Sequence, residues 1–226
     1  MFRLAVGEIA VIFDADIVIT DQTCIEKLVQ PIINQKADMT SSAIYELPTS
    51  TYFEQVLDVS MRLKRVLFAN LKKGNNVYNC HGPARAFSKE FYKRLTFLDS
   101  AGEDMFSYLA IIHMGGVFRY VPSSKVSYRL PSMPEDHYKQ SLRYLKAIDN
   151  MKLLFTEQFV NNEFSIPNKV FVISAIKAVP LALRYPTHVF IYILTLLGTY
   201  LGKVLKISPK ELWKVASSKN LNLNVK

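Results

Sequence analysis

A short apolar run near the start of the chain leads straight into two acidic residues. Residues 9–13 are all apolar and mostly β-branched or aromatic, and Asp14 and Asp16 follow them with a single alanine between. A continuous apolar run of this length predicts a buried parallel strand in the middle of a sheet. The aspartates would then lie just beyond its carboxyl end, where ligands bind in open α/β sheets.

Strand-like and helical patterns alternate after this run. Apolar residues recur with helical spacing in some segments, and short β-branched or aromatic stretches separate them. Glycines or turn residues mark most of the boundaries. This alternation predicts an α/β layered domain. The expected helices cover about 21–35, 52–71, 89–95, 103–114 and a stretch from Pro134, and the expected strands cover 39–47, 84–87, 117–121 and 125–130.

The chain becomes strongly apolar towards its end. Residues 170–183 and 187–204 contain few polar side chains, and a membrane-spanning helix needs about 20 mostly apolar residues. Arg184, Lys203 and Lys206 flank the second segment, as suits the edges of a bilayer. The pattern indicates membrane association, with a buried soluble helix as the alternative, and it leaves spanning and interfacial placements open. The expected division is therefore 1–165, the α/β portion, which lacks the beginning of its domain; 166–207, membrane-associated helices; and 208–226, a basic polar tail.

The net charge of +9 predicts attraction to an anionic partner. Nucleic acid, an anionic membrane and a phosphorylated substrate all qualify, but the basic residues are not interleaved with aromatic residues on a recognisable nucleic-acid module, which argues against nucleic acid. The basic residues of 62–65 are expected on a solvated helix face, or against anionic lipid. Cys24 and Cys80 match no zinc pattern and are expected to be reduced thiols.

Several polar residues could carry chemistry. Asp14 and Asp16 would point to the same side if the strand continued through them, and could then share Mg²⁺ or Mn²⁺; a polar turn is the plainer interpretation. Glu103 and Asp104 open a helix, where they could cap it, or where one of them could act as a general base. Further candidates are His81 and Gly82, in a turn that could contact an acceptor, and Gln140, Arg143 and Tyr144 on one helix face.

The order of these motifs resembles a known family. A D-x-D, a glycine turn in "GPARAF", an E-D that opens a helix, and a Q-x-x-R-aromatic in "QSLRY" precede the apolar helices. This order resembles the family 2 glycosyltransferases of GT-A fold, and looks most like the membrane-associated branch that includes cellulose, chitin and hyaluronan synthases. The resemblance covers residues 6–145, and it implies an incomplete GT-A-like fold, Rossmann-like, with a mixed sheet, flanking helices and apolar helices after it.

The resemblance also implies roles for the site residues. Asp14 and Asp16 match the D-x-D that binds a divalent cation, Mg²⁺ or Mn²⁺, and the donor diphosphate. Asp104 matches the catalytic base, with Glu103 supporting it. The three residues of the Q-x-x-R motif, Gln140, Arg143 and Tyr144, match those that hold the diphosphate and the acceptor end of the site. The implied activity is an inverting, hexosyltransferase-type transfer from a nucleotide-sugar to a lipid-linked or polysaccharide acceptor, at the cell membrane with the catalytic domain facing the cytoplasm.

Two departures from the family pattern bear on this expectation. Tyr144 replaces the usual tryptophan, which keeps a stacking surface but leaves processivity open. Family members also carry a nucleotide-binding half before the D-x-D, and only residues 1–13 precede Asp14 here. We therefore expect a truncated enzyme, a misplaced start, or one part of a split protein whose other chain supplies the missing half. The alternative is a non-catalytic remnant that binds a membrane or a partner.

Overall fold

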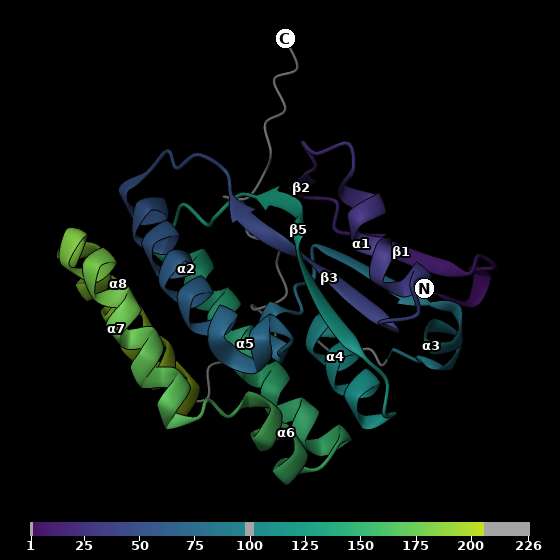
Figure 1. The fold of residues 1–226 in the computed structure, drawn as a ribbon. Coiled ribbons are helices and arrows are strands. Elements are labelled where there is room, and N and C mark those ends of the chain that lie inside the picture. The colour runs from purple at the N-terminus through teal and green to yellow at the C-terminus, as the bar shows by residue number, and fades with distance from the viewer. Residues whose placement is uncertain (1, 98–101, 206–226) are drawn as a thin grey trace.

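A computed structural model describes residues 2–97 and 102–205 of the chain. Its centre is a five-stranded mixed sheet in the order β1-β4-β3-β5-β2 (Figure 1). Only the β3–β5 pair is parallel; β1–β4, β3–β4 and β2–β5 are antiparallel. The predicted α/β fold with a mixed sheet and flanking helices is confirmed. The strands are β1 (Ile9–Phe13), β2 (Ile17–Val18), β3 (Met39–Glu46), β4 (Ala84–Ser88) and β5 (Phe118–Tyr128).

The parallel orientation predicted for β1 is wrong. The strand lies at the edge of the described sheet, runs antiparallel to β4, and all five of its residues are half-buried. Its sequence is apolar because both of its faces are covered: Ile9 and Val11 pack towards α1, whereas Ala10 and Ile12 pack on the opposite side. Face burial makes a strand apolar whether or not a neighbour pairs with each edge, so the pattern could not reveal the sheet order.

The two strands expected at 117–121 and 125–130 form the single strand β5. It pairs with β3 along its whole length, with a register shift opposite Ser42 and Ala43. Residues 122–124, which begin with Pro122, fill that bulge. Proline cannot donate to the ladder, so a bulge accommodates it without ending the strand.

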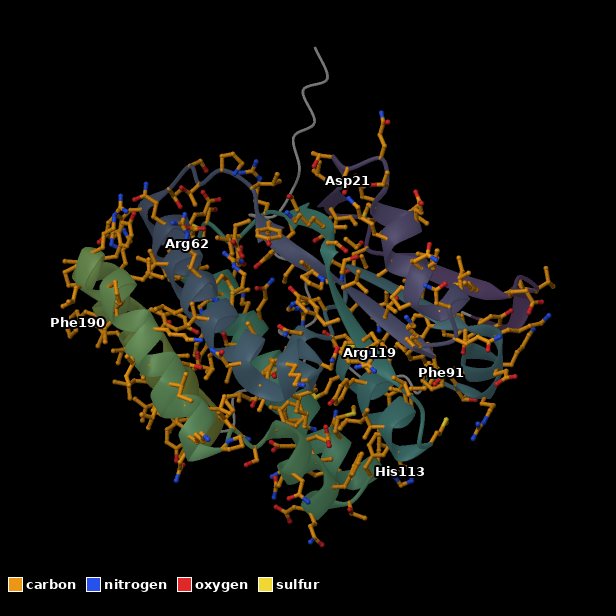
Figure 2. The ribbon with its side chains drawn as sticks, viewed as in Figure 1. Asp21, Arg62, Phe91, His113, Arg119 and Phe190 are labelled. Atoms are coloured by element: carbon orange, nitrogen blue, oxygen red, sulfur yellow. The ribbon has the colours of Figure 1, made fainter. Side chains whose placement is uncertain are left out.

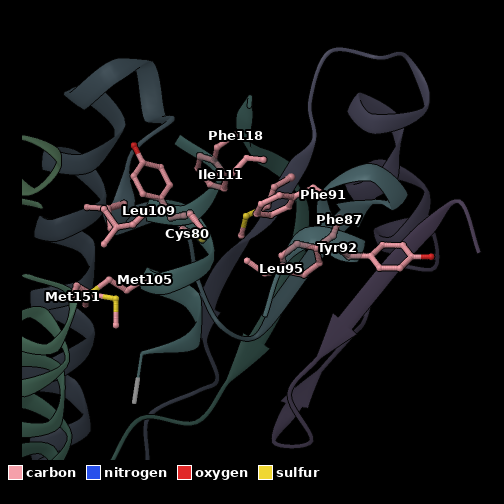
Figure 3. Packing of buried hydrophobic residues seen from close by; sticks show 14 of the residues in the cluster. Cys80, Phe87, Phe91, Tyr92, Leu95, Met105, Leu109, Ile111, Phe118 and Met151 are labelled. Carbon is pink, nitrogen blue, oxygen red and sulfur yellow. The ribbon is translucent and has the colours of Figure 1, made fainter. Parts of the chain in front are cut away.

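Helices cover both faces of the sheet and extend beyond one side of it (Figure 1). On one face, α1 packs over small strand residues such as Ala84 and Ala86. On the other, α3 and α4 pack around Phe87 and Phe118 (Figure 3). The helices are α1 (Cys24–Ile33), α2 (Tyr52–Asn70), α3 (Lys89–Arg94), α4 (Glu103–His113), α5 (Pro134–Leu154), α6 (Glu157–Phe164), α7 (Asn168–Arg184) and α8 (Pro186–Val204), with 3₁₀ turns η1 (Phe2–Leu4), η2 (Leu71–Gly74) and η3 (Val77–Asn79).

The last two helices form a hairpin that packs lengthwise on α2 and α5, on the side of the molecule away from α1 and α3 (Figure 1). Near the start of α8, Tyr52 donates from its hydroxyl to Thr187 Oγ1 at 3.2 Å. Near its end, Lys203 pairs with Asp149 of α5 at 2.9 Å. In α7, Ser174 Oγ accepts from Asn70 at the end of α2. The hairpin is therefore attached to the domain along its length.

The polarity of the hairpin is the reverse of that of a helix in a water-soluble protein. The faces of α8 that meet α2 and α5 carry Thr199 and Gly202, both buried, and the buried residue of α7 is Ser174. The outward faces are apolar, and Figure 2 places Phe190 on the side away from the rest of the chain. These exposed residues are Phe171, Val172, Ile173, Ile176, Val179, Leu183, Phe190, Ile193, Leu194, Leu196, Leu197, Tyr200, Leu201, Val204 and Leu205.

Two helical segments are long and apolar enough to cross a membrane by length and composition. They are 157–184 and α8, and the first of them joins α6 to α7 across a break at 165–167. A large exposed apolar surface of this kind marks an interaction site, and it fits the predicted membrane association. The predicted tail at 208–226 and Lys206 lie outside the described residues.

Candidate active site

The start of α4 is placed by a glycine. Gly102, at the N-cap, has φ +90°, and a Cβ there would lie 2.9 Å from the Cβ of Ala147 in α5. Only glycine combines this backbone conformation with so close an approach. The first turn of α4 can therefore abut α5, which brings Glu103 and Asp104 beside the polar face of that helix.

Asp14 and Asp104 converge at Gly82. A Cβ built on Gly82 would lie 3.6 Å from Oδ2 of Asp14 and 3.8 Å from Oδ2 of Asp104. The turn is held to the end of β1 because the Asp14 amide donates to the carbonyl of Pro83 at 3.1 Å. Because residue 82 has no side chain, the space between the two carboxylates stays open.

These carboxylates line a cavity of about 970 Å³ that lies among α2, α4, α5 and α8. Eight of the nine predicted site residues line it. The ninth, Asp16, does not: β1 ends at Phe13, and Ala15 and Asp16 form an exposed turn before β2. The strand does not continue through the D-x-D, so the strand geometry that would place both aspartates on one side does not apply to them. The predicted residues that line the cavity are Asp14, His81, Gly82, Glu103, Asp104, Gln140, Arg143 and Tyr144.

One face of α5 supplies Gln140, Arg143 and Tyr144. Pro134 starts this helix at a position where a missing amide is tolerated. Arg143 and Tyr144 follow Gln140 by three and four residues, so all three share one face of the helix. Tyr144 lines the cavity with 43% of its surface exposed, and desolvation by the protein around it raises the pKa of its phenol. The tyrosine therefore stays a neutral hydroxyl, while Arg143, half-buried beside it, supplies a positive charge to the cavity wall.

His81 lies in the cavity wall as a neutral imidazole. Burial, and then the charge of Arg65, lower the pKa of His81 to about 4. Its backbone amide donates to Ser41 Oγ at 2.9 Å, which fixes the turn on β3. The adjacent Cys80 is buried and free, and its thiol donates to the carbonyl of Asp104 at 3.3 Å. The histidine can thus offer a hydrogen bond in the cavity, but not a charge near pH 7.

Sequence reasoning missed Arg85, a buried arginine in the cavity wall. Arg85 is only 2% exposed, and its Nη1 donates to Ser107 Oγ of α4 at 3.0 Å. Its Nε has no hydrogen-bond partner within the described part of the chain. A buried cation with an unused donor is costly unless an anion meets it. The signal was available, because a charged residue stands between two alanines of a predicted strand.

The predicted orientation of two basic residues of α2 is wrong. Lys64 and Arg65 line the cavity instead of facing solvent. Arg65 pairs with Glu46 of β3 at 2.7 Å, and the ammonium of Lys64 lies 5.2 Å from the centre of the Tyr192 ring. Both residues lie on the same face of α2 as Leu57 and Met61, which also line the cavity. The helical pattern could not show that α8 covers that face.

The residues present fit a divalent cation that binds together with a phosphorylated substrate. The described residues contain no cluster of three or more histidine, cysteine, aspartate or glutamate side chains that could form a complete site. Asp14 does offer carboxylate oxygens beside the open space at Gly82. Mg²⁺ is usually held by one or two carboxylates together with substrate phosphates and water, so a sparse donor set of this kind suits it.

Comparisons with known proteins identify the family of the chain. Residues 9–212 match the model of the family described as glycosyl transferase family group 2. No match was found among curated proteins. The solved structures that match include the mannosyltransferase PcManGT from Pyrobaculum calidifontis in complex with GDP-Man and Mn²⁺, at 16% identity and a TM-score of 0.48. That match covers 93% of this chain, which spans 59% of the length of the other.

Proposed function

The chain belongs to glycosyl transferase family group 2, and from that premise we propose that its cavity is the site of sugar transfer from a nucleotide-sugar donor. The predicted family is confirmed. The observation that carries the proposal is the convergence of Asp14 and Asp104 on the open space at Gly82, in a cavity that also contains Arg143. The proposed reaction is inverting and metal-dependent, and the acceptor is lipid-linked or a polysaccharide.

Asp104 is the proposed general base. Its carboxylate is half-buried at the cavity wall, and the amide of Met105 donates to its Oδ1 at 2.8 Å, which leaves Oδ2 facing the space at Gly82. From there it can take the proton of an acceptor hydroxyl as that oxygen attacks the anomeric carbon. Glu103, exposed beside it, supports this role by its negative charge at the same helix start.

The donor diphosphate is proposed to lie between Asp14 and Arg143 of α5. Arg143 can bind phosphate oxygens with its planar guanidinium, and Gln140 and Tyr144 can donate to them from the same helix. Asp14, with Asp16 on the adjoining turn, would hold Mg²⁺ or Mn²⁺, and the bound cation would stabilise the charge that develops on the departing diphosphate.

The hairpin of α7 and α8 supports a membrane location. Its apolar face points outward, and contacts from Thr187 to Lys203 tie α8 to α2 and α5 along its length. A crossing helix would carry α2, with its Asp58–Arg62 ion pair, into the hydrocarbon, which is costly. We therefore propose that the hairpin lies in the plane of the bilayer interface and that the catalytic domain, with the chain's net charge of +9, faces the cytoplasm.

The catalytic proposal is tested with Asp104→Asn. Loss of a general base is expected to lower transfer on the order of 10²- to 10⁴-fold, with nucleotide-sugar binding retained. The matched control is Glu135→Gln, which removes an exposed acid from the first turn of α5. Removing divalent cations with a chelator is expected to abolish transfer, and adding Mg²⁺ or Mn²⁺ to restore it. Normal turnover by Asp104→Asn would contradict the base assignment, and a folded wild type with no turnover of any donor would favour the non-catalytic alternative.

The membrane proposal is tested by flotation with anionic vesicles. Replacing Phe190 and Leu197 of the outward face with aspartate is expected to keep the protein out of the vesicle fraction. An equal number of aspartates at Gln158 and Asn161 of α6 serves as the control. Flotation that is unchanged by the first pair of substitutions would contradict membrane binding through this face.

A further inference from the structure

The cavity has two chemically different ends. At one end are the carboxylates of Asp14 and Asp104 with Arg85. At the other end the lining comes from apolar and aromatic residues of α2 and α8, together with one threonine. These residues are Leu57, Met61, Phe68, Tyr192, Leu196, Thr199 and Tyr200. A ligand that fills the cavity therefore meets polar groups at the catalytic end and mostly hydrocarbon at the other.

The apolar end opens on the outward face of α8. Leu196 and Tyr200 line the cavity, yet they are 47% and 64% exposed. One turn of helix separates them, so together they border the opening. Leu197 and Leu201, which belong to the outward apolar face, lie next to them on the same helix. The cavity thus communicates with the surface that we propose to be in contact with lipid.

A cation, Lys64, lies at the apolar end of the cavity, beside Met61 and Tyr192. Lys64 lines the cavity, its ammonium lies 3.9 Å from the sulfur of Met61 and 5.2 Å from the centre of the Tyr192 ring, and no ion pair with Lys64 occurs among the described residues. His137 nearby does not add a second charge, because burial and the charge of Lys64 lower its pKa to about 4. An anionic group in the cavity would complete the environment of Lys64.

We infer, on the basis of the function proposed above, that the acceptor is a phosphate-linked lipid saccharide that enters from the membrane past α8. Its hydrocarbon chain lies along Leu196 and Tyr200, its phosphate meets Lys64, and its sugar hydroxyl reaches Asp104. In the transfer step the acceptor oxygen forms a bond to the anomeric carbon, the bond from that carbon to the diphosphate oxygen breaks with its electron pair, and the hydroxyl proton passes to Asp104.

The opening is tested with Leu196→Trp and the matched control Leu197→Trp, adjacent residues of which only the first lines the cavity. The probe is a hexadecyl phosphate ester of a hexose in phosphatidylcholine vesicles, compared with the soluble methyl phosphate ester. Leu196→Trp is expected to lower transfer to the hexadecyl ester on the order of tenfold or more, with transfer to the methyl ester and donor hydrolysis within about twofold of wild type. If Leu196→Trp and Leu197→Trp lowered transfer to the hexadecyl ester equally, the inference would be overturned.

Lys64→Met tests the phosphate contact. The variant is expected to raise the KM for the hexadecyl phosphate ester on the order of tenfold while leaving the KM for the uncharged hexadecyl glycoside unchanged. Equal changes with both acceptors would contradict a contact between Lys64 and phosphate. Wild-type transfer to a soluble glycan that is faster than transfer to either lipid would favour a polysaccharide acceptor and overturn the lipid assignment.

A binding measurement separates this inference from the catalytic proposal. Tyr200→Cys and Leu201→Cys place thiols at neighbouring positions of similar exposure, 64% and 59%, of which only residue 200 lines the cavity. The hexadecyl phosphate ester is expected to slow maleimide labelling at residue 200 but not at residue 201. This result would support the lipid site even if no donor were turned over, and equal labelling rates at both positions would overturn it.

Discussion

The carboxylates of Asp14 and Asp104 lie within 3.8 Å of one point, the position that a Cβ would occupy at Gly82. An alanine there would make ordinary van der Waals contacts, so Gly82→Ala is expected to fold normally. Its methyl group would nevertheless fill the gap in which the cation and the reacting groups meet in the proposed reaction. We expect transfer to fall on the order of 10²-fold, with the thermal unfolding midpoint unchanged. Normal turnover by the folded variant would show that the gap is not used.

Arg85 is expected to be costly for stability and necessary for turnover. Replacing it with methionine, which has a similar length, removes a buried charge whose Nε has no partner among the described residues. Ser107 keeps a hydrogen bond, because its hydroxyl also donates to the carbonyl of Glu103. The variant is therefore expected to unfold at the same or a higher denaturant concentration.

The same Arg85→Met substitution is expected to weaken binding of the anionic donor, because it removes a positive charge from the cavity wall. Chemical denaturation and donor titration measure the two effects separately. A large loss of stability together with unchanged donor binding would assign Arg85 a purely structural role.

Docking of the hairpin on α5 depends on Gly202. A Cβ at this position would collide with the hydroxyl of Tyr138, whereas a Cβ at Gly198, one turn earlier, would meet nothing within 4 Å. Gly202→Ala is expected to destabilise the protein by about 1–3 kcal/mol through overpacking. The matched control Gly198→Ala is expected to be neutral or stabilising by up to about 1 kcal/mol, since alanine favours helix. Thermal unfolding in detergent measures both, and equal effects would place Gly202 away from a close contact.

Acidification is expected to weaken the fold before the carboxylates titrate. Burial, together with Lys64 near His137 and Arg65 near His81, lowers the pKa of each histidine to about 4, whereas the imidazole of an unfolded chain titrates near 6.5. Above pH 6.5 both states hold neutral imidazoles. As the pH falls from 6.5 towards 4, the unfolded chain takes up protons that the folded chain does not, so stability declines.

Urea unfolding at pH 7.5 and pH 5 measures this decline. The variant His137→Gln, which cannot titrate, is expected to lose less stability between the two pH values than the wild type does. An equal loss in both proteins would show that His137 is solvated in the folded state.

The local parts of the structure were predictable from the sequence. Gly102 before two acids predicted the start of α4, and the spacing of Gln140 and Arg143 predicted their common helix face; in both cases the signal lies within a few residues. The order of the motifs in the chain predicted the family, and the structure brings Asp14 and Asp104 to one cavity. The roles of these residues remain predictions.

The errors concern relationships between distant segments. The run at 9–13 predicted a parallel strand, but strand direction depends on which strand pairs beside it, and face burial does not record that. Lys64 was expected in solvent because α8, which covers it, comes much later in the chain. Asp14 and Asp16 would have shared a side only if the strand continued, but the backbone turns after Phe13, and the same-side rule holds only within a strand.

The edge position of β1 has a consequence for control of the enzyme. On its outer side, the strand has no hydrogen-bonding neighbour among the described residues, and Asp14 follows its last residue directly. A guest strand that extended the sheet by β-augmentation would therefore end beside the carboxylate that we propose to face the donor. Recruitment of such a segment, from the same polypeptide or another, would cover an aggregation-prone edge and reshape the cavity beside Asp14 in a single association event.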